Sequence, residues 1–228
     1  MTRILWDAAG TRRYEAGIDR GVLFVDGEPG VPWNGLTSLK HSTVDSEVRR
    51  FYNDGIKYIH NVTPGEYEAE LAAYTYPTQF ERCNGSLEID RGLSLDSQVR
   101  KPFGLSYRTR IGNDTRGSDY GYRIHVVYNA FASPSNADFS TIGDTATPST
   151  FAWHLTTLPV NFPGYLPSSH FTLNSRRASS RVMTQVETIL YGSPTTTPRL
   201  PLPEELYEIF LLNNNPEDTF TEFFEAAF

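Results

Sequence analysis

The stretch from Phe103 to Asn129 decides the fold, and it reads FGLSYRTRIGNDTRGSDYGYRIHVVYN. In its first part the apolar side chains occupy alternate, odd positions: Phe103, Leu105, Tyr107 and Ile111. In its second part they occupy even positions: Tyr120, Tyr122, Ile124, Val126 and Tyr128. A period of two predicts strands with one buried face and one face toward solvent. The two runs therefore predict an antiparallel hairpin, around which the rest of the chain packs.

The connection inside this hairpin is unusual. Gly112 to Asp119 would form a polar loop of eight residues, whereas hairpin loops usually have about two to five. We expect such a loop to project from the sheet, either as a mobile tip or as an arm that contacts another molecule.

Composition narrows the class of protein. A chain of 228 residues suits one domain, or one domain with an appendage. Cys83 is the only cysteine, which excludes an internal disulfide and a cysteine-based zinc site. No apolar run approaches the roughly 20 residues of a membrane span, and the N-terminus lacks the apolar core of a signal peptide. We therefore expect a soluble protein that is made in the cytosol.

The net charge of −7 is concentrated in one segment. Beyond Arg199 the chain has seven acidic residues and no Lys or Arg, so residues 1–199 hold 20 acidic and 20 basic residues. A formally neutral body lacks the basic stripe of a nucleic-acid-binding protein.

Shorter patterns extend the mainly β prediction. Residues 21–25, 56–62 and 67–76 each suggest a strand, and the last of these alternates clearly although its Ala, Glu and Leu would also allow a helix. Phe151, Trp153 and Leu155 restart the alternation after a long loop over 132–150.

The period changes near residue 179. Five apolar residues recur at helical spacing, which predicts a helix over about 179–191 with Ser179 as its N-cap and Gly192 after its end: Ala178, Val182, Val186, Ile189 and Leu190. We divide the chain into a β domain over 1–192 and an extension over 193–228. The extension contains a proline-rich linker, a second small helix from Pro203 and an acidic, phenylalanine-rich end.

The residues of that end also follow a helical pattern. Thr219 and Glu222 form a capping-box pattern, and Phe220, Phe223, Phe224 and Ala227 would share one face. We expect this segment to pack on the outside of an assembly or on a neighbouring copy.

No motif indicates catalysis. Gly112-x-x-x-x-Gly117-Ser118 lacks the lysine of a phosphate-binding loop and joins two strands. The five histidines are far apart in sequence, and we expect His125 and His154 on strand faces opposite the aromatic residues, as surface or loosely hydrogen-bonded residues. A site gathered from several such histidines by the fold is the less favoured alternative. Cys83 lies beside Arg82, which could lower its pKa, although an ordinary thiol fits better. We expect no catalytic residues, no cofactor and no metal.

An ordered series of motifs resembles a known family. Near the front are Tyr14-Glu15-Ala16-Gly17-Ile18-Asp19-Arg20-Gly21-Val22-Leu23 and Pro32-Trp33-Asn34-Gly35-Leu36; then Gly121 to Ala130 (GYRIHVVYNA), Phe151-x-Trp153, Thr156-Thr157-x-Pro159, Pro167-x-x-His170, Ile189-Leu190-Tyr191-Gly192 and Pro198-Arg199-Leu200-Pro201. Over residues 14–205 the chain is similar to the major tail tube proteins of long-tailed, siphovirus-type bacteriophages, especially those that infect actinobacteria.

The resemblance implies a mainly β protein, an antiparallel β-sandwich or barrel with a flanking helix. Family members form hexameric rings with a continuous β-barrel, and the rings stack into the tail tube of the virion. It implies a structural, non-enzymatic protein that is assembled in the host cytoplasm. The implied partners are further copies, a tape-measure protein, other tail proteins and double-stranded DNA that passes through the lumen without specific binding.

Two sets of residues are predicted to serve the assembly. The hairpin loop would contact a neighbouring subunit through Asn113, Asp114, Thr115, Arg116, Ser118 and Asp119. Three acidic residues would face the lumen: Glu66, Glu68 and Glu70. Alternative interpretations are a distal tail or tail-terminator ring protein, a carbohydrate-binding sandwich with exposed Trp33, Trp153 or Tyr165, and a hydrolase that uses His125, Asp119 and Ser118.

Overall fold

The computed structural model describes residues 6–43, 48–53, 56–62, 66–134 and 148–213. It is mainly β, with antiparallel strand pairs and flanking helices, as the sequence predicts. The strands are β1 (Arg13–Val25), β2 (Val31–Pro32), β3 (Leu36–Thr43), β4 (Val48–Asn53), β5 (Ile56–Val62), β6 (Tyr67–Ala73), β7 (Leu87–Asp90), β8 (Leu93–Leu95), β9 (Phe103–Asn113), β10 (Gly117–Pro134), β11 (Phe151–Thr157), β12 (Val160–Phe162), β13 (Tyr165–Ser168) and β14 (His170–Asn174). The helices are η1 (Thr78–Phe80), α1 (Glu81–Asn84), α2 (Ser180–Tyr191) and α3 (Pro203–Asn213).

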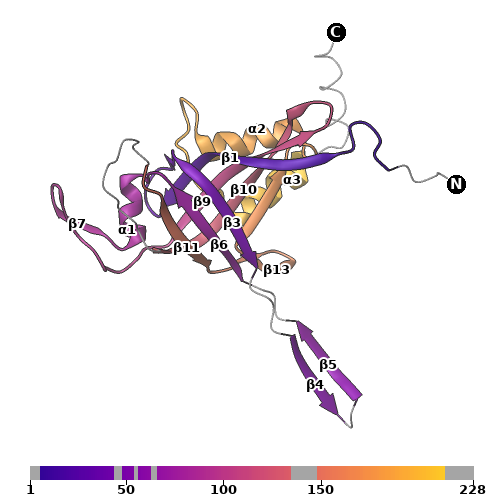
Figure 1. The fold of residues 1–228 in the computed structure, drawn as a ribbon, viewed down its shortest axis with the longest axis horizontal. Helices are drawn as coiled ribbons and strands as arrows, with labels where there is room; N and C mark the ends of the chain where they lie inside the picture. The colour runs from indigo at the N-terminus through magenta and orange to yellow at the C-terminus, as the bar shows by residue number, and fades with distance from the viewer. Residues whose placement is uncertain (1–5, 44–47, 54–55, 63–65, 135–147, 214–228) are drawn as a thin grey trace.

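One curled sheet forms the body of the protein (Figure 1). Its strand order is β2-β1-β9-β10-β11-β6-β3, and β14 pairs with β10 beside β11. The curl brings β3 back close to β1, but no ladder joins these two strands in the described part of the chain. Three two-stranded hairpins, β4–β5, β7–β8 and β12–β13, lie outside this sheet.

The central hairpin is present, but its connection is shorter than predicted. β9 continues to Asn113 and β10 begins at Gly117, so the prediction of an eight-residue loop over 112–119 is wrong. Asn113 and Gly117 pair across the turn, and Gly117 has a φ of 58°, a backbone conformation that glycine adopts at little cost. The polar residues therefore extend the strands to the tip of the hairpin.

Strand β1 also begins earlier than predicted. It starts at Arg13 rather than near Gly21, and its register with β9 shifts twice between Ala16 and Val22. Gly17 and Arg20 have φ values of 74° and 49° at these shifts. Such bulges break the period of two, so the alternation that would have shown the strand is absent from the sequence.

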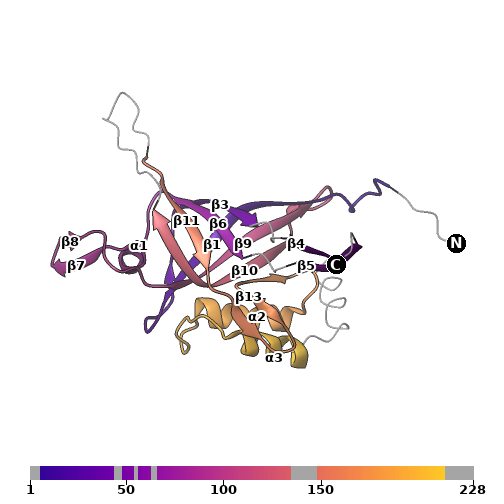
Figure 2. The same cartoon turned by 90° about the horizontal axis from the view of Figure 1, so that it is seen from below.

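The expectation of one buried and one solvent face is wrong for the centre of the hairpin. Leu105 and Val127 face an inner core that the curled sheet encloses, together with the buried Trp33 and Trp153. Ile124 and Val126 face an outer core that helices α2 and α3 cover. Both faces are therefore buried, because a helical layer distant in sequence covers the face that would otherwise be wet (Figure 2).

Helix α2 confirms the sequence prediction closely. It spans Ser180–Tyr191, the Ser179 hydroxyl accepts a hydrogen bond from the backbone N–H of Val182, and Gly192 follows its end. Val182, Val186 and Leu190 are fully buried on its inner face. α3 begins at Pro203, as predicted, while the predicted helical pattern after Asn213 and most of the predicted loop over 132–150 lie outside the described residues.

Candidate functional site

Three of the five histidines converge on the inner side of the sheet, although they are far apart in sequence. His41 on β3, His125 on β10 and His170 on β14 have ring centroids within 5.1 to 5.9 Å of one another. His125 is only 5% exposed, so of its two predicted settings, at the surface or hydrogen-bonded, the surface position is wrong. His154, by contrast, keeps a side chain that is 45% exposed beside Glu68.

Hydrogen bonds link these histidines to neighbouring strands. His125 Nδ1 lies 3.1 Å from His170 Nε2, and the Tyr107 hydroxyl lies 2.9 Å from His41 Nε2. The ring of Tyr107 is parallel to that of His125 at a centroid distance of 4.5 Å. We call His41, His125, His170 and Tyr107, with Tyr67 against His170, the histidine cluster.

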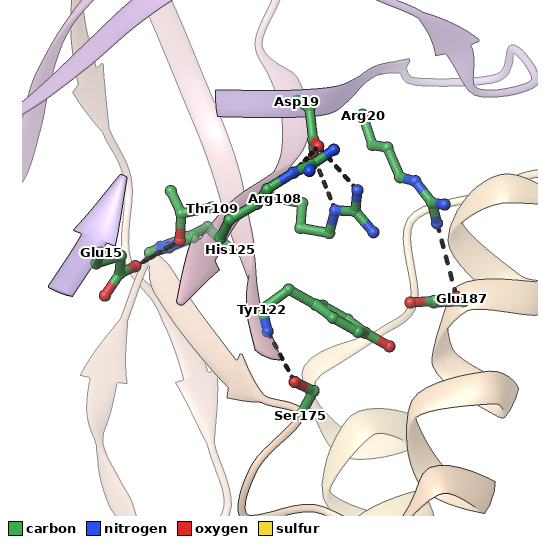
Figure 3. A network of polar contacts seen from close by, with 10 residues as sticks. Glu15, Asp19, Arg20, Arg108, Thr109, Tyr122, His125, Ser175 and Glu187 are labelled. Carbon is green, nitrogen blue, oxygen red and sulfur yellow. Dashed lines mark hydrogen bonds and ion pairs between the residues drawn. The ribbon is translucent and has the colours of Figure 1, made fainter. Parts of the chain in front are cut away.

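A carboxylate terminates the chain of hydrogen bonds (Figure 3). Thr109 Oγ1 donates to Glu15 and lies 3.0 Å from His125 Nε2. Arg123 donates to the second oxygen of Glu15 at 2.6 Å. Because the Thr109 hydroxyl uses its proton to donate to Glu15, it accepts the N–H at Nε2 of His125. His125 Nδ1 then carries no proton, and it accepts the N–H at Nε2 of His170. Two neutral imidazoles satisfy this arrangement.

Burial makes the neutral state favourable. Loss of solvation lowers the pKa of His125 to about 4 and that of His170 to about 3, although the carboxylate of Glu15 opposes the shift at His125. Loss of solvation also lowers the pKa of His41 and raises that of Tyr67 to about 12. The cluster is therefore uncharged at neutral pH, because loss of solvation disfavours the charged form of each ring.

A second polar network ties β1 to β9 and α2 (Figure 3). Arg108 donates to both oxygens of Asp19, at 2.7 and 2.8 Å, and Arg110 donates to one of them at 3.1 Å. The hydrogen bond from Arg108 is the main cause of a lowered pKa at Asp19. Arg20 reaches Glu187 on α2 at 3.9 Å. These pairs hold the bulged part of β1 in place.

The residues of the proposed hydrolase site do not come together. His125 is engaged by His170 and Thr109, while Ser118 and Asp119 are exposed beside the hairpin turn. Cys83 is buried, and its pKa is raised to about 11, mainly by desolvation, so its thiol is not activated by Arg82. In the described ranges, no group of three or more His, Cys, Asp or Glu side chains is arranged to hold a metal ion.

The predicted contact residues lie at the tip of the central hairpin. Thr115, Arg116, Ser118 and Asp119 are exposed there. Asn113 is 3% exposed and accepts the backbone N–H of Arg116. Asp114 accepts from the backbone N–H of Gly10 at 3.0 Å, so the tip is partly occupied by the chain's own N-terminal segment.

The three predicted lumen residues lie at or beside β6. Ala69, Leu71 and Ala73 are buried in the inner core, while Glu68 and Glu70 alternate with them. Glu70 pairs with Lys40 at 3.9 Å and Glu68 with His154 at 3.4 Å. Glu66 is exposed just before the strand. The alternation confirms the strand, in preference to the helix that its composition would allow.

Sequence reasoning missed one exposed surface. The β7–β8 hairpin carries four large apolar side chains that are 45 to 59% exposed: Leu87, Ile89, Leu93 and Leu95. Leu87 and Leu95 are paired across the hairpin and therefore point to the same side. The alternation of Leu-x-Ile and Leu-x-Leu around Arg91-Gly92 is visible in the sequence, but nothing local shows that the sheet leaves it uncovered.

The tryptophans of the carbohydrate-binding interpretation are buried. Trp33 and Trp153 are 2% and 3% exposed and lie 5.8 Å apart in the inner core, so they offer no face to a sugar. Tyr165 is 69% exposed but stands without those partners. This placement counts against a sugar-binding platform built on these three residues.

Comparison with known proteins adds distant structural neighbours. No protein-family model and no curated protein matches the chain. It is similar to the PVC sheath-tube complex of an extracellular contractile injection system, with 15% identity, a TM-score of 0.35 and coverage of 68% of this chain and 88% of that one. It is also similar to the anti-feeding prophage tube-terminating cap, with 13% identity, a TM-score of 0.38 and coverage of 77% and 97%. TM-scores this low assign no function to this chain.

The described helices include none long and apolar enough to cross a membrane.

Proposed function

We propose that this protein is a structural subunit of a phage tail. Copies of it form hexameric rings with a continuous β-barrel, and the rings stack into the tube through which DNA is delivered. It acts by assembly and transforms no substrate. Its partners are further copies, a tape-measure protein and other tail proteins.

The observation that carries this proposal is the open margin of the curled sheet. β2 covers only two residues of β1, Val22 and Leu23, and β3 pairs only with β6 among the described strands. Free strand edges present backbone N–H and C=O groups that another strand can pair with. Copies arranged in a ring would satisfy those groups, and a closed barrel has no edges.

The motif series over residues 14–205 gives independent support, because its amino-acid sequence resembles that of tail tube proteins. The two strand runs at its centre, β9 and β10, form the middle of the curled sheet. The exposed apolar hairpin β7–β8 is a second surface that suits contact with protein, since exposed apolar patches commonly mark such interfaces.

Electron microscopy of the purified full chain tests the proposal. At increasing protein concentration we expect rings and then long tubes of uniform diameter, with sedimentation velocity showing the loss of monomer. Single rings that never lengthen would indicate a terminator or distal ring protein instead. A chain that stays monomeric at all concentrations would contradict an assembling subunit.

A further inference from the structure

A groove opens where β1, the segment after β2 and the end of α2 meet. It has a volume of about 630 Å³, within the range of roughly 300–1,000 Å³ that is typical of binding sites in proteins. Its accessible apolar lining comes from four partly exposed residues: Ile18, Leu36, Tyr191 and Pro198. Nothing in the described part of the chain fills it.

The groove is lined by one cationic side chain, Arg20, whose ion pair with Glu187 is long. The Arg20 side chain is 50% exposed, and its distance to the Glu187 carboxylate is 3.9 Å. The neighbouring Asp19 also lines the groove, but its charge is already matched by Arg108 and Arg110. The groove therefore combines an apolar lining with an accessible positive charge.

The C-terminal segment after Asn213 has the complementary chemistry in its sequence. Phe220, Phe223 and Phe224 are spaced at i, i+3 and i+4, the spacing by which an amphipathic helix places anchors in an apolar groove. The same segment contains four acidic residues and no basic one: Glu217, Asp218, Glu222 and Glu225.

The far end of α3 lies away from the groove, which favours a groove on another copy. Phe210, near the end of α3, lines a pocket with Ala178 just before α2, whereas the groove lies at the opposite end of α2, beside Tyr191. α3 begins at Pro203, five residues after the groove residue Pro198, and it ends at Asn213. Eleven helical residues carry the chain roughly 16 Å, and the acidic segment starts from that far end. A neighbouring copy can offer its groove without the chain having to turn back.

We propose that residues 214–228 of one copy bind the groove of a second copy, with the phenylalanines on its apolar lining and a carboxylate beside Arg20. The inference rests on the proposed function, because it requires copies to assemble. It makes the phenylalanine-rich segment a connector between subunits.

Disulfide trapping tests the pairing directly. Asn34→Cys places a thiol at an exposed groove residue, and Ala227→Cys places one on the phenylalanine face without removing an anchor. Mixing the two full-length variants under oxidising conditions should give a covalent heterodimer, and adding Arg20→Glu to the groove variant should lower its yield several-fold. Ala226→Cys, off the apolar face, is the matched control. The native Cys83 is fully buried and should not compete.

The outcomes separate this inference from the proposed function. The double variant Phe223→Asp/Phe224→Asp should reduce assembly, while Thr221→Asp, off the phenylalanine face, should leave it unchanged. If wild-type tubes form and no heterodimer between Asn34→Cys and Ala227→Cys appears, the connector is wrong and the tube proposal stands. A wild-type chain that neither assembles nor yields the heterodimer overturns both.

Discussion

His125 and His170 share one hydrogen bond between two neutral rings inside the sheet, and loss of solvation disfavours a further proton on either ring. His125 donates its single N–H, at Nε2, to the Thr109 hydroxyl, which in turn donates to Glu15. The hydrogen-bonded residues come from β1, β9, β10 and β14. Protonation of the cluster would therefore weaken the side-chain hydrogen bonds that connect these strands.

This geometry predicts a loss of stability in acid. Unfolded histidine has a pKa of about 6.5, whereas burial lowers the pKa of His125 to about 4 and of His170 to about 3 in the folded protein. The unfolded state therefore binds more protons below pH 6.5, and stability falls as pH falls through this window, by up to roughly 1.4 kcal/mol per pH unit for each histidine. Urea unfolding between pH 7 and 4 measures the slope.

Carboxylates also contribute to the dependence of stability on pH, so comparing variants is needed to isolate the contribution of the histidine cluster. His170→Gln should remove about one histidine's share of the pH dependence between pH 6 and 4. His154→Gln, at a half-exposed position outside the cluster, is the matched control for replacing a histidine. Equal slopes in wild type and His170→Gln would show that the cluster is not the cause.

Replacement of Asp19 should also lower the free energy of unfolding. Asp19 holds Arg108, whose side chain is only 13% exposed, through two hydrogen bonds and also pairs with Arg110. Asp19→Asn leaves a mostly buried guanidinium without its counter-charge, and we expect a loss of about 1–3 kcal/mol in the free energy of unfolding.

Asp7→Asn is the matched control, because Asp7 and Arg12 are exposed and form an ion pair at the surface. Exposed pairs contribute little, so its effect should stay within about 0.5 kcal/mol. Chemical denaturation at pH 7 measures both variants, and equal effects would contradict a structural role for the Asp19 pairs.

At the scale of the element, the stability of helix α2 depends on the glycine that follows its C-terminal end. Gly192 has a φ of 78°, and a Cβ added there would lie 2.8 Å from the carbonyl oxygen of Thr196. Gly192→Ala should therefore cost about 2 kcal/mol or more, from backbone strain and the clash. Gly164 has the same φ of 78° with open space around it, so Gly164→Ala isolates the strain and should cost less. Thermal unfolding of both variants checks the difference.

The elements were predictable where their pattern is local. Helix α2 shows its cap, its apolar face and its stop within residues 179–192, and strands β9 and β10 show their alternation. The bulged part of β1 and the buried second face of β10 were not predictable, because they depend on register shifts and on helices that begin 46 and 69 residues after the end of β10. The members of the histidine cluster were not predictable for the same reason, since only the order of strands in the sheet brings His41 and His170 beside His125.

For the whole molecule, the exposed β7–β8 hairpin offers the sharpest separation of folding from assembly. Leu93 and Leu95 are 59% and 49% exposed and contribute little to the cores of the monomer. Leu93→Ser/Leu95→Ser should therefore change the free energy of unfolding by less than about 0.5 kcal/mol per site, yet weaken self-association, because an apolar surface buried only in the assembly is lost. Ser94→Asn, between them in the strand, is the matched control. Sedimentation velocity measures self-association and urea unfolding measures monomer stability on the same samples. If the double variant assembles like wild type, the hairpin is not an interface. If the double variant loses monomer stability, the two leucines contribute to the fold instead.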